Sequence, residues 1–479
     1  MVDQPNIILL TVDCLRYDRC SFNGHFRETT QNLDNMLQES VVFDQAYSTG
    51  PWTSDSVPGI LAGLHSHNSA YFDSPNLKAI PRGTTTIAED LSSQGYNTFA
   101  ILSNPHLTKG RNFDIGFDKF QNIRSDLNEK RFSEEDSKSN SIIQLGDILW
   151  KLRERMQNRD QLRIISPYTH MFSSYRSIQK FRGWPTISAQ EVISKLCNTI
   201  DGTDRPFFAW SHLMDLHAPL NPESVKEGGL LENDSSYRQY IYDARRAANI
   251  QESRYNLMYD STLRYIDQWI GKLVEYLKNN GYWEDTIIIL TSDHGEALHE
   301  KGVYGHVSLG EEFAHDEPRH YLYDELLHVP LMVRIPNKDG SRVQRQFSLA
   351  WINEILEEIL GEDLTSFPAE TGVSHLDGNE ELESPVYSDS ITENGHTIAV
   401  RNQKYKYTKM EHAREISDDG IGSYLSNGIE NKLGSMSQIP IELIEFSEAH
   451  FCEPSSLSAV NAELGENVDD LLKQLGYKN

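Results

Sequence analysis

Long apolar runs rich in β-branched residues recur along the first 350 residues of the chain. Polar and apolar positions do not alternate in these runs, which is typical of strands that are buried on both faces of a parallel sheet. Two of the runs end in a carboxylate, at Asp13 and Asp293. The runs predict five strands, over residues 6–13, 98–103, 206–212, 286–293 and 329–333.

Helical patterns lie between these strands. Thr86 and Glu89 have the spacing of a capping box, which predicts a short helix that stops at Gly95. A second helix is predicted by apolar residues at steps of three and four. These residues are Leu263, Ile266, Ile270, Leu273 and Leu277. Strands that alternate with helices indicate an α/β fold, in which ligands bind beyond the carboxyl ends of the strands.

Two segments differ from this pattern. Residues 124–182 hold 12 lysines and arginines against 8 acids, in a chain whose net charge is −27. We interpret this segment as an insertion or lid with an amphipathic helix at 142–156, which packs on the body or contacts an anionic substrate or a membrane surface. Residues 351–384 carry ten acids and no lysine or arginine, and we predict a surface-exposed acidic connector there.

The predicted organisation is a catalytic domain over residues 1–350 and a C-terminal subdomain over residues 385–479, joined by the connector. Apolar stretches at 385–388 and 397–401 predict strands in the C-terminal subdomain. We expect a central, mostly parallel sheet between layers of helices in the larger domain, and a smaller α+β unit in the C-terminal subdomain.

The charge of the chain excludes some partners. With 71 acids against 44 bases, the protein is expected to repel nucleic acids. Such an acidic surface fits a protein of a salt-rich, halophilic cytoplasm as well as an ordinary acidic cytosolic enzyme. The four cysteines have no Cys-x-x-Cys spacing, which indicates a reduced, cytoplasmic chain. We expect no signal peptide and no transmembrane segment, because the N-terminus lacks a basic region and no apolar stretch approaches about 20 residues.

Hard oxygen and imidazole donors gather at two predicted strand ends. Asp13, Asp293 and His294 suit a divalent cation that activates a bound group. A nucleophile is predicted in the loop over residues 48–63, which enters a helix. A hydroxyl near a helix N-terminus lies among free N–H groups that bind anions such as sulfate or phosphate. Thr53 is the candidate, although taken alone it also fits a helix N-cap.

Several motifs, taken in order, resemble the sulfatase family of the alkaline phosphatase superfamily. They are Pro5–Asp13, Asn32–Asp34, Val42–Ser48, Ile60–Gly63, Gly116–Asp118, His212–Pro219, Ser292–Glu296, Leu322–Glu325 and His328–Leu331. The likeness spans residues 5–336, with a weaker echo at 401–407. It implies an alkaline-phosphatase-like α/β fold and the hydrolysis of sulfate esters.

The resemblance implies a metal centre with a nucleophile beside it. Asp13, Asp293 and His294 match the metal ligands of the family. Thr53 matches the nucleophile, where it also touches the metal. The implied cofactor is one divalent ion, with Ca²⁺ as the first choice and Mn²⁺ or Zn²⁺ as alternatives, held at roughly 2.0–2.6 Å.

The resemblance also implies groups that handle the substrate. His217 and His306 resemble the residues that hold the substrate's oxygens and protonate the leaving group, and we expect His217 to be the first candidate for the acid and His306 the second. His320 is the alternative to His306, because residues 307–319 look like an insertion. Asn104 and His106 fall near positions where the family keeps polar residues that bind substrate.

The chain departs from the family at the nucleophile. Most sulfatases carry a Cys/Ser-x-Pro-x-Arg motif whose first residue is oxidised to formylglycine, whereas Thr53–Val57 has neither the proline nor the arginine. Threonine cannot form the aldehyde, so a formylglycine-independent enzyme with in-line attack by Thr53 is implied. Cys14 and His294 stand where many sulfatases have a second aspartate and an asparagine.

Three functions are open at this point. The first is metal-dependent hydrolysis of sulfate esters of small molecules or glycans. The second is a phosphodiesterase, or a phosphoglycerol- or phosphoethanolamine-type phosphotransferase, because an Asp/Thr/Asp/His set around one metal resembles the threonine-nucleophile members of the superfamily. The third is a non-catalytic family member that kept the fold.

Overall fold

The computed structural model describes residues 4–123, 186–231, 252–298, 304–306 and 322–361, and then 364, 371, 373–378, 382, 385–393, 395–412, 415–416, 421–426, 429–433 and 436–460. The predicted insertion at 124–182, with its helix at 142–156, lies outside these residues, and so does His320. Among the helices in the described ranges, none is both long and apolar enough to cross a membrane.

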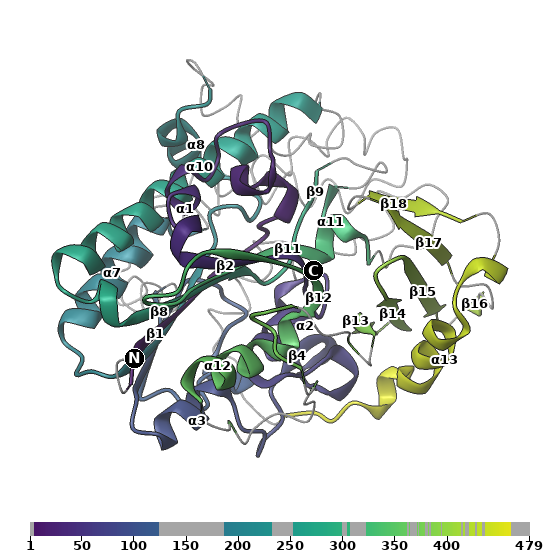
Figure 1. The fold of residues 1–479 in the computed structure, drawn as a ribbon. Coiled ribbons are helices and arrows are strands. Elements are labelled where there is room, and N and C mark those ends of the chain that lie inside the picture. The colour runs from purple at the N-terminus through teal and green to yellow at the C-terminus, as the bar shows by residue number, and fades with distance from the viewer. Residues whose placement is uncertain are drawn as a thin grey trace, which may run out of the picture.

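An eight-stranded, mostly parallel sheet forms the centre of the protein (Figure 1). Its strands, in spatial order, are β12 (Ser341–Ser348), β2 (Ser40–Tyr47), β11 (His328–Arg334), β8 (Thr286–Ser292), β1 (Asn6–Val12), β7 (Phe207–Leu213), β5 (Asn97–Leu102) and β6 (Lys119–Asn122). The five predicted strands are confirmed and are neighbours, from β11 to β5. Only β11 runs antiparallel to its two neighbours, and all other pairs are parallel.

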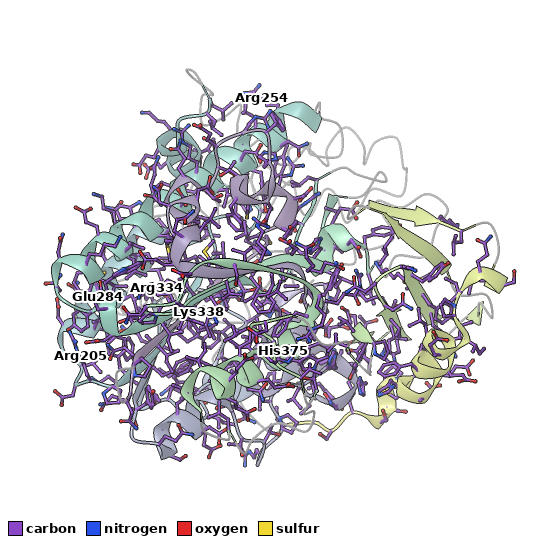
Figure 2. All side chains as sticks on the ribbon, viewed as in Figure 1. Arg205, Arg254, Glu284, Arg334, Lys338 and His375 are labelled. Atoms are coloured by element: carbon purple, nitrogen blue, oxygen red, sulfur yellow. The ribbon has the colours of Figure 1, made fainter. Side chains whose placement is uncertain are left out.

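Helices cover both faces of this sheet, because successive residues of its strands point to opposite sides. Ile7 and Leu9 of β1 pack with α2 (Thr53–Ala62), α3 (Ile87–Ser93) and α12 (Ile352–Leu360). Ile8 and Leu10 pack on the other face with α1 (Gln31–Asp34), α7 (Ala189–Asp201) and α10 (Glu252–Asn279). Figure 1 shows α7 and α10 on one side of the sheet and α3 and α12 on the other, and side chains fill the space between these layers (Figure 2).

Both predicted helices are present. Thr86 is the N-cap of α3, and its hydroxyl accepts a hydrogen bond from the backbone N–H of Glu89. The five apolar residues of the second pattern are buried along α10. Short elements connect the larger ones. They are β3 (Ala70–Phe72), β4 (Ser74–Ala79), α8 (Pro222–Gly228), β9 (Ala297–Leu298), β10 (Tyr304–Gly305) and α11 (Asp324–Leu327).

The prediction of a surface-exposed connector at 351–384 is wrong for its first part. This part is the helix α12, whose residues Ile352, Ile355 and Leu356 belong to the core on one face of the sheet. Glu354 is also buried, and its carboxylate binds Nε2 of His375 at 2.9 Å (His375 is labelled in Figure 2). The many acids of the segment hid the spacing of its apolar residues, which is that of a buried helix face.

The C-terminal part forms a second, smaller antiparallel sheet with one helix against it, as predicted. Its strands are β13 (Val386–Thr392), β14 (Gly395–Arg401), β15 (Tyr405–His412), β16 (Glu415–Ile416), β17 (Ile421–Ser426) and β18 (Ile429–Lys432), and the helix is α13 (Ile441–His450). The two strands expected at 385–388 and 397–401 correspond to β13 and β14. This sheet has its own small core around Ile398 and Val400.

Strand β13 fastens the small sheet to the loop that leads into α2. The Ser388 hydroxyl donates to the carbonyl of Ser48 at 2.6 Å, and the Asp389 N–H donates to the carbonyl of Thr49 at 2.9 Å. The Ser390 hydroxyl donates to the Asp55 carboxylate at 2.6 Å.

A buried cation completes this attachment. The Lys78 ammonium lies 3.1 Å from the Asp55 carboxylate, and both side chains are fully buried. It also donates to the carbonyl of Ile391 in β13 at 2.5 Å. Removing one member of a buried, hydrogen-bonded ion pair typically costs about 3–5 kcal/mol, so Asp55 and Lys78 fix the first turn of α2.

Histidines from the turn after α2 and from strand β14 surround Asp389. Its carboxylate accepts from Nδ1 of His67 at 2.9 Å and from Nε2 of His396 at 3.1 Å, and His65 Nδ1 lies 3.8 Å away. Burial lowers the pKa of His396, but the hydrogen bond to Asp389 outweighs it and raises the pKa to about 9. Burial lowers the pKa of His65 to about 3.

Stability is therefore expected to fall between neutral and alkaline pH. The pKa of His396 is raised from 6.5 to about 9 in the folded protein, so its contribution is complete below pH 6.5 and disappears as the pH passes 9. We expect a loss of up to roughly 3 kcal/mol between pH 6.5 and 10. Chemical unfolding at a series of pH values measures it. In His396→Asn this step should disappear, and an unchanged step in that variant would contradict the assignment.

Candidate active site

Four parallel strands end at the same edge of the sheet and deliver predicted site residues there. Asp13 follows β1, and Asp293 and His294 follow β8. The loop after β2 leads to Thr53 at the start of α2, and Asn104 follows β5. Because these strands are neighbours or near neighbours in the sheet, residues that are far apart in the sequence meet at one place.

The predicted metal ligands and the predicted nucleophile lie together in the buried interior. One ligand atom from each of Asp13, Asp293 and His294 lies within 4.8 Å of the other two. Oγ1 of Thr53 is 3.4 Å from Oδ2 of Asp13 and 3.4 Å from Nε2 of His294. The exposed fraction of each of these four side chains is 1% or less.

The chemistry of this donor set fits a divalent cation. Oδ2 of Asp293 is buried and has no hydrogen-bond donor among the described residues. Burial and the charge of Asp13 raise the pKa of Asp293, while hydrogen bonding from His212 and nearby imidazole charges hold the pKa of Asp13 well below its usual range despite burial. Two carboxylates this close repel each other, and a cation between them relieves both the repulsion and the unpaired oxygen.

The hydrogen bond of His294 prepares it as a ligand. Its Nδ1 lies 2.8 Å from the carbonyl oxygen of Gly295, which can only accept, so Nδ1 carries the proton. Nε2 is then unprotonated and faces Asp13 and Asp293, at 3.5 Å from an oxygen of each. A backbone carbonyl that fixes the tautomer in this way is common for histidine ligands of metals.

The structure separates Thr53 from the neighbouring hydroxyl. Ser54 accepts hydrogen bonds from the N–H of Lys78 and from Nη2 of Arg111, both at 2.7 Å, and donates to the carbonyl of Asn76 at 3.1 Å. Its hydroxyl is thus fully engaged away from the carboxylates. The alternative interpretation of Thr53 as a helix N-cap is wrong, because Trp52 holds the N-cap position and Thr53 is the first residue of α2.

The predicted histidines lie beside this centre. The rings of His217 and His306 are 5.1 Å apart, and His306 is 4.4 Å from the ring of His294. Nδ1 of His306 forms a short hydrogen bond with the Glu296 carboxylate, whereas Nδ1 of His217 faces the carbonyl of Ala218 at 2.6 Å.

The net pKa shifts of the two imidazoles have opposite directions. Burial lowers the pKa of both rings. For His306 the charge and hydrogen bond of Glu296 outweigh burial and raise the pKa, whereas burial leaves the pKa of His217 at about 4. An imidazolium is thus favoured at His306 and a neutral imidazole at His217.

Asn104 and His212 contact the centre directly. Nδ2 of Asn104 donates to Oδ2 of Asp13 at 2.9 Å and to Oγ1 of Thr53 at 3.3 Å, which places this amide beside the predicted nucleophile. The N–H of His106 donates to Oδ1 of Asn104 at 2.9 Å, and Nδ1 of His106 lies 3.1 Å from Nη1 of Arg111. His212 and Glu296 were not predicted. Nε2 of His212 is 3.4 Å from Oδ2 of Asp13, and the signal for it was a histidine near the end of an apolar strand.

Comparison with known proteins decides the family. The sequence pattern of the sulfatase family matches residues 5–360. The chain belongs to the sulfatase family. The alkaline-phosphatase-like α/β fold inferred from the sequence is thereby confirmed, and a phosphonate monoester hydrolase of Agrobacterium radiobacter has a similar fold, with a TM-score of 0.61, 16% identity and coverage of 93% of this chain and 94% of that one.

Sequence relatives within the sulfatase family are distant. An N-acetylglucosamine-6-O-sulfatase of Bacteroides thetaiotaomicron is 24% identical over 71% of this chain and 64% of its own length. An arylsulfatase of Clostridium perfringens is 26% identical over 62% of this chain and 64% of its own length. The chain thus matches less than two thirds of the length of these relatives.

Proposed function

We propose that this sulfatase-family protein is a metal-dependent hydrolase of sulfate esters, in which Thr53 is the nucleophile. The observation that carries the proposal is the position of Oγ1 of Thr53, 3.4 Å from both Asp13 and His294 and beside the unpaired oxygen of Asp293. The names of the relatives, which include an N-acetylglucosamine-6-O-sulfatase, support a sulfated sugar as the substrate.

Asp13, Asp293, His294 and Thr53 would hold the cation. A bound divalent ion supplies a positive charge that favours the alkoxide of Thr53 and neutralises charge on the substrate's oxygens. Three of its four ligand atoms are hard oxygens, which supports Ca²⁺ or Mn²⁺, and the imidazole also suits Zn²⁺.

The residues around Thr53 support in-line displacement. Asn104 donates a hydrogen bond to Oγ1, which stabilises the negative charge that develops there. Oγ1 loses its proton to solvent and forms a bond to the sulfur. The bond from sulfur to the leaving oxygen breaks, and that oxygen takes one proton as it departs. Water then attacks the sulfur of the threonine ester, which releases sulfate and returns the proton to Thr53.

We propose that His306 is the acid that protonates the leaving oxygen in the first step. We propose that His217 is the base that takes a proton from water in the second step. The carboxylate of Glu296 stabilises an imidazolium at His306, whereas a carbonyl only orients His217 with an unprotonated Nε2. The sequence alone had favoured His217 as the acid, and these hydrogen-bond partners favour the other order.

The two histidines are distinguished by the leaving group. A nitrophenolate leaves without taking a proton, whereas an alkoxide needs one. In the step that forms the threonine ester, His306→Ala is therefore expected to lower the rate with alkyl sulfates by about 10²–10⁴-fold. The rate of this step with nitrophenyl sulfate should change little. Single-turnover rates of both substrates measure this. If His217→Ala slows only the alkyl sulfates, and His306→Ala slows both substrates equally, the two roles are reversed.

The charges of the site support a substrate with one negative charge. Asp13, Asp293 and Glu296 supply three negative charges, which one divalent cation and the imidazolium of His306 together balance, so the site has no excess positive charge to attract a second charge on the substrate. A sulfate ester and a phosphodiester each carry one charge, whereas a phosphate monoester carries nearly two. The monoester is therefore expected to be the poorest substrate.

A phosphodiesterase or a phosphoglycerol- or phosphoethanolamine-type phosphotransferase is the second candidate. The threonine supports it, because a threonine ester can pass its phosphoryl group to a second alcohol. A panel of nitrophenyl sulfate, nitrophenyl phosphate and bis-nitrophenyl phosphate, each with Ca²⁺, Mn²⁺ or Zn²⁺, separates the candidates. If nitrophenyl sulfate is hydrolysed fastest, the result supports our proposal. If the diester is hydrolysed fastest, it supports the second candidate, and inactivity on all three supports a non-catalytic member.

A further inference from the structure

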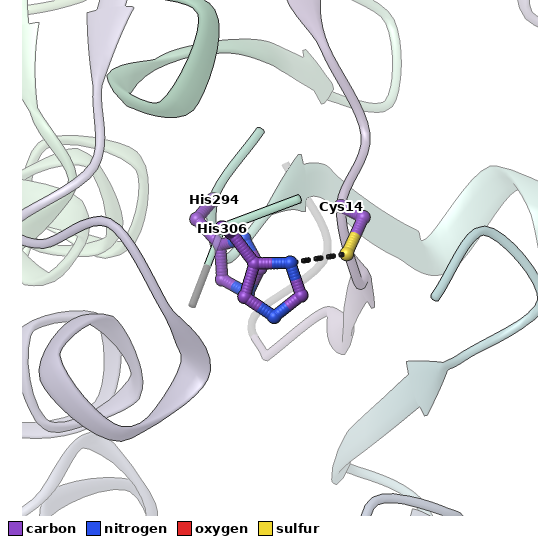
Figure 3. A group of neighbouring side chains, drawn as sticks. All are labelled: Cys14, His294 and His306. Carbon is purple, nitrogen blue, oxygen red and sulfur yellow. Dashed lines mark hydrogen bonds between the residues drawn. The ribbon is translucent and has the colours of Figure 1, made fainter. Parts of the chain in front are cut away.

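A thiol and two imidazoles meet next to the proposed hydrolytic centre. Cys14, His294 and His306 each offer a ligand atom within 4.8 Å of the other two, and all three side chains are buried (Figure 3). We propose that these residues form a second site, which binds a soft divalent metal such as Zn²⁺ and shares His294 with the hydrolytic site. The inhibitory consequence of this site, but not the site itself, rests on the proposed function.

The distance between the thiol and the imidazole suits zinc. Sγ of Cys14 is 3.6 Å from Nδ1 of His306, as the dashed line in Figure 3 marks. A tetrahedral zinc ion, with a Zn–S distance of about 2.3 Å and a Zn–N distance of about 2.0–2.1 Å, places its sulfur and nitrogen ligands about 3.6 Å apart. The two side chains thus already have the spacing of zinc ligands.

The backbone holds the thiol in this place. Cys14 has a φ of 63°, in the left-handed region that residues other than glycine rarely adopt. Two hydrogen bonds hold the peptide group that follows Cys14 in this conformation. The Tyr259 hydroxyl donates to the carbonyl of Cys14 at 2.5 Å, and the N–H of Leu15 donates to the Ser292 hydroxyl at 2.9 Å. An unfavourable backbone conformation that is fixed in this way is typical of functional positions, and here it directs a thiol toward two histidines.

A carboxylate is available as a fourth ligand. Glu296 contacts Nδ1 of His306 with one oxygen, while its other oxygen, Oε1, is buried and has no hydrogen-bond donor in the part of the chain that the structure describes. A buried, unpaired carboxylate oxygen is costly, and a cation beside it removes that cost. The set of thiolate, imidazoles and carboxylate is one that Zn²⁺ and Co²⁺ accept.

The two sites compete for one nitrogen. Nδ1 of His294 is engaged with the carbonyl of Gly295, so only Nε2 can bind a metal, and it can bind one at a time. The oxygen-rich set around Asp13 favours a hard cation, and the set with Cys14 favours a soft one. Binding at the soft site replaces the thiol proton, which Sγ now donates to Oδ1 of Asp13 at 2.9 Å, and withdraws His306 from its proposed role as the acid. Zinc in this site therefore inhibits the hydrolase.

Cobalt reports on the thiolate directly. With Co²⁺ added to the metal-free full-length protein, we expect a thiolate-to-cobalt charge-transfer band in the near ultraviolet, which Zn²⁺ abolishes by displacement. Cys14→Ser should lose the band. Cys20→Ser is the matched control, because Cys20 is equally buried but its thiol faces the carbonyl of Arg16, and this variant should keep the band. No band in the parent protein, or a band that persists in Cys14→Ser, would overturn the proposal.

A binding measurement separates this inference from the proposed function. Calorimetric titration with Zn²⁺ should show an affinity at least ten-fold weaker in Cys14→Ser than in Cys20→Ser. A band and zinc binding in a protein that hydrolyses no ester would leave the soft site standing and remove the proposed function. If the protein hydrolyses esters, zinc does not inhibit it and the cobalt band is absent, the proposed function stands and the soft site is removed.

Discussion

Thr53→Ala is expected to lower kcat for the best ester substrate by about 10⁴–10⁶-fold, because loss of a nucleophile has effects of this size in comparable enzymes. The change removes the only hydroxyl that lies against both Asp13 and His294 among the described residues. The alanine keeps Cβ as a methyl group at the start of α2. Because Asp55 and Lys78 hold the first turn of this helix, the fold should survive. Rates at saturating substrate measure kcat, and circular dichroism checks the fold.

Two variants serve as controls for this prediction. Thr53→Ser keeps the hydroxyl and should recover most of the lost rate. Ser54→Ala should retain activity, because the Ser54 hydroxyl binds Asn76, Lys78 and Arg111 and not the metal ligands. An inactive Ser54→Ala together with an active Thr53→Ala would move the nucleophile by one residue. Mass spectrometry of the intact protein should find no formylglycine at position 53, and an aldehyde at Ser54 or Ser56 would restore the usual sulfatase mechanism.

The second large effect is expected from Asp293→Asn, which should lower metal affinity by more than about 100-fold. Changes of residues that only support metal ligands already cost 10–100-fold. Oδ2 of Asp293 is the unpaired buried oxygen of the site, and the amide that replaces the carboxylate carries no charge to attract a cation. Elemental analysis after gel filtration measures the bound metal, and stoichiometric metal in the variant would sink the assignment.

A matched control and a second measurement sharpen this test. Asp267 is also buried, but its carboxylate accepts the backbone N–H groups of Asn32 and Leu33 far from the site, so Asp267→Asn should keep its metal and lose only stability. In the absence of metal, Asp293→Asn should melt at a higher temperature than the parent protein, because it removes the repulsion between Asp293 and Asp13. With metal present the order should reverse.

The centre of the sheet could be predicted from the sequence, and its edges could not. The five central strands are buried on both faces and therefore read as continuous apolar runs. The outer strand β12 has exposed residues at its start, including Ser341 and Arg342, and its pattern resembles a loop. The antiparallel direction of β11 was also outside the reach of the sequence, because a strand buried on both faces has the same pattern in either direction.

The site was predictable where a residue follows directly on a strand. Asp13 and Asp293 ended apolar runs, and their neighbourhood followed from the parallel sheet. His212 was missed because its role depends on register: it lies opposite Thr11 in the pairing of β1 with β7, and Thr11 binds its Nδ1 at 2.8 Å. Glu296 was missed because its contact with His306 depends on the pairing of β9 with β10, and strands of two residues leave no pattern in the sequence.

The attachment of β13 limits how this family can exchange its parts. Segments that recombine freely, in evolution or in the laboratory, share few contacts at their junction. Here the small sheet supplies hydrogen bonds to Ser48, Thr49 and Asp55, which lie within five residues of the proposed nucleophile. A chimera that takes its C-terminal sheet from a relative would also have to take the matching loop and the start of α2. The small sheet and the residues around Thr53 should therefore be exchanged together. A fragment that ends before residue 385 would lose the hydrogen bonds that hold the loop and the first turn of α2 around Thr53.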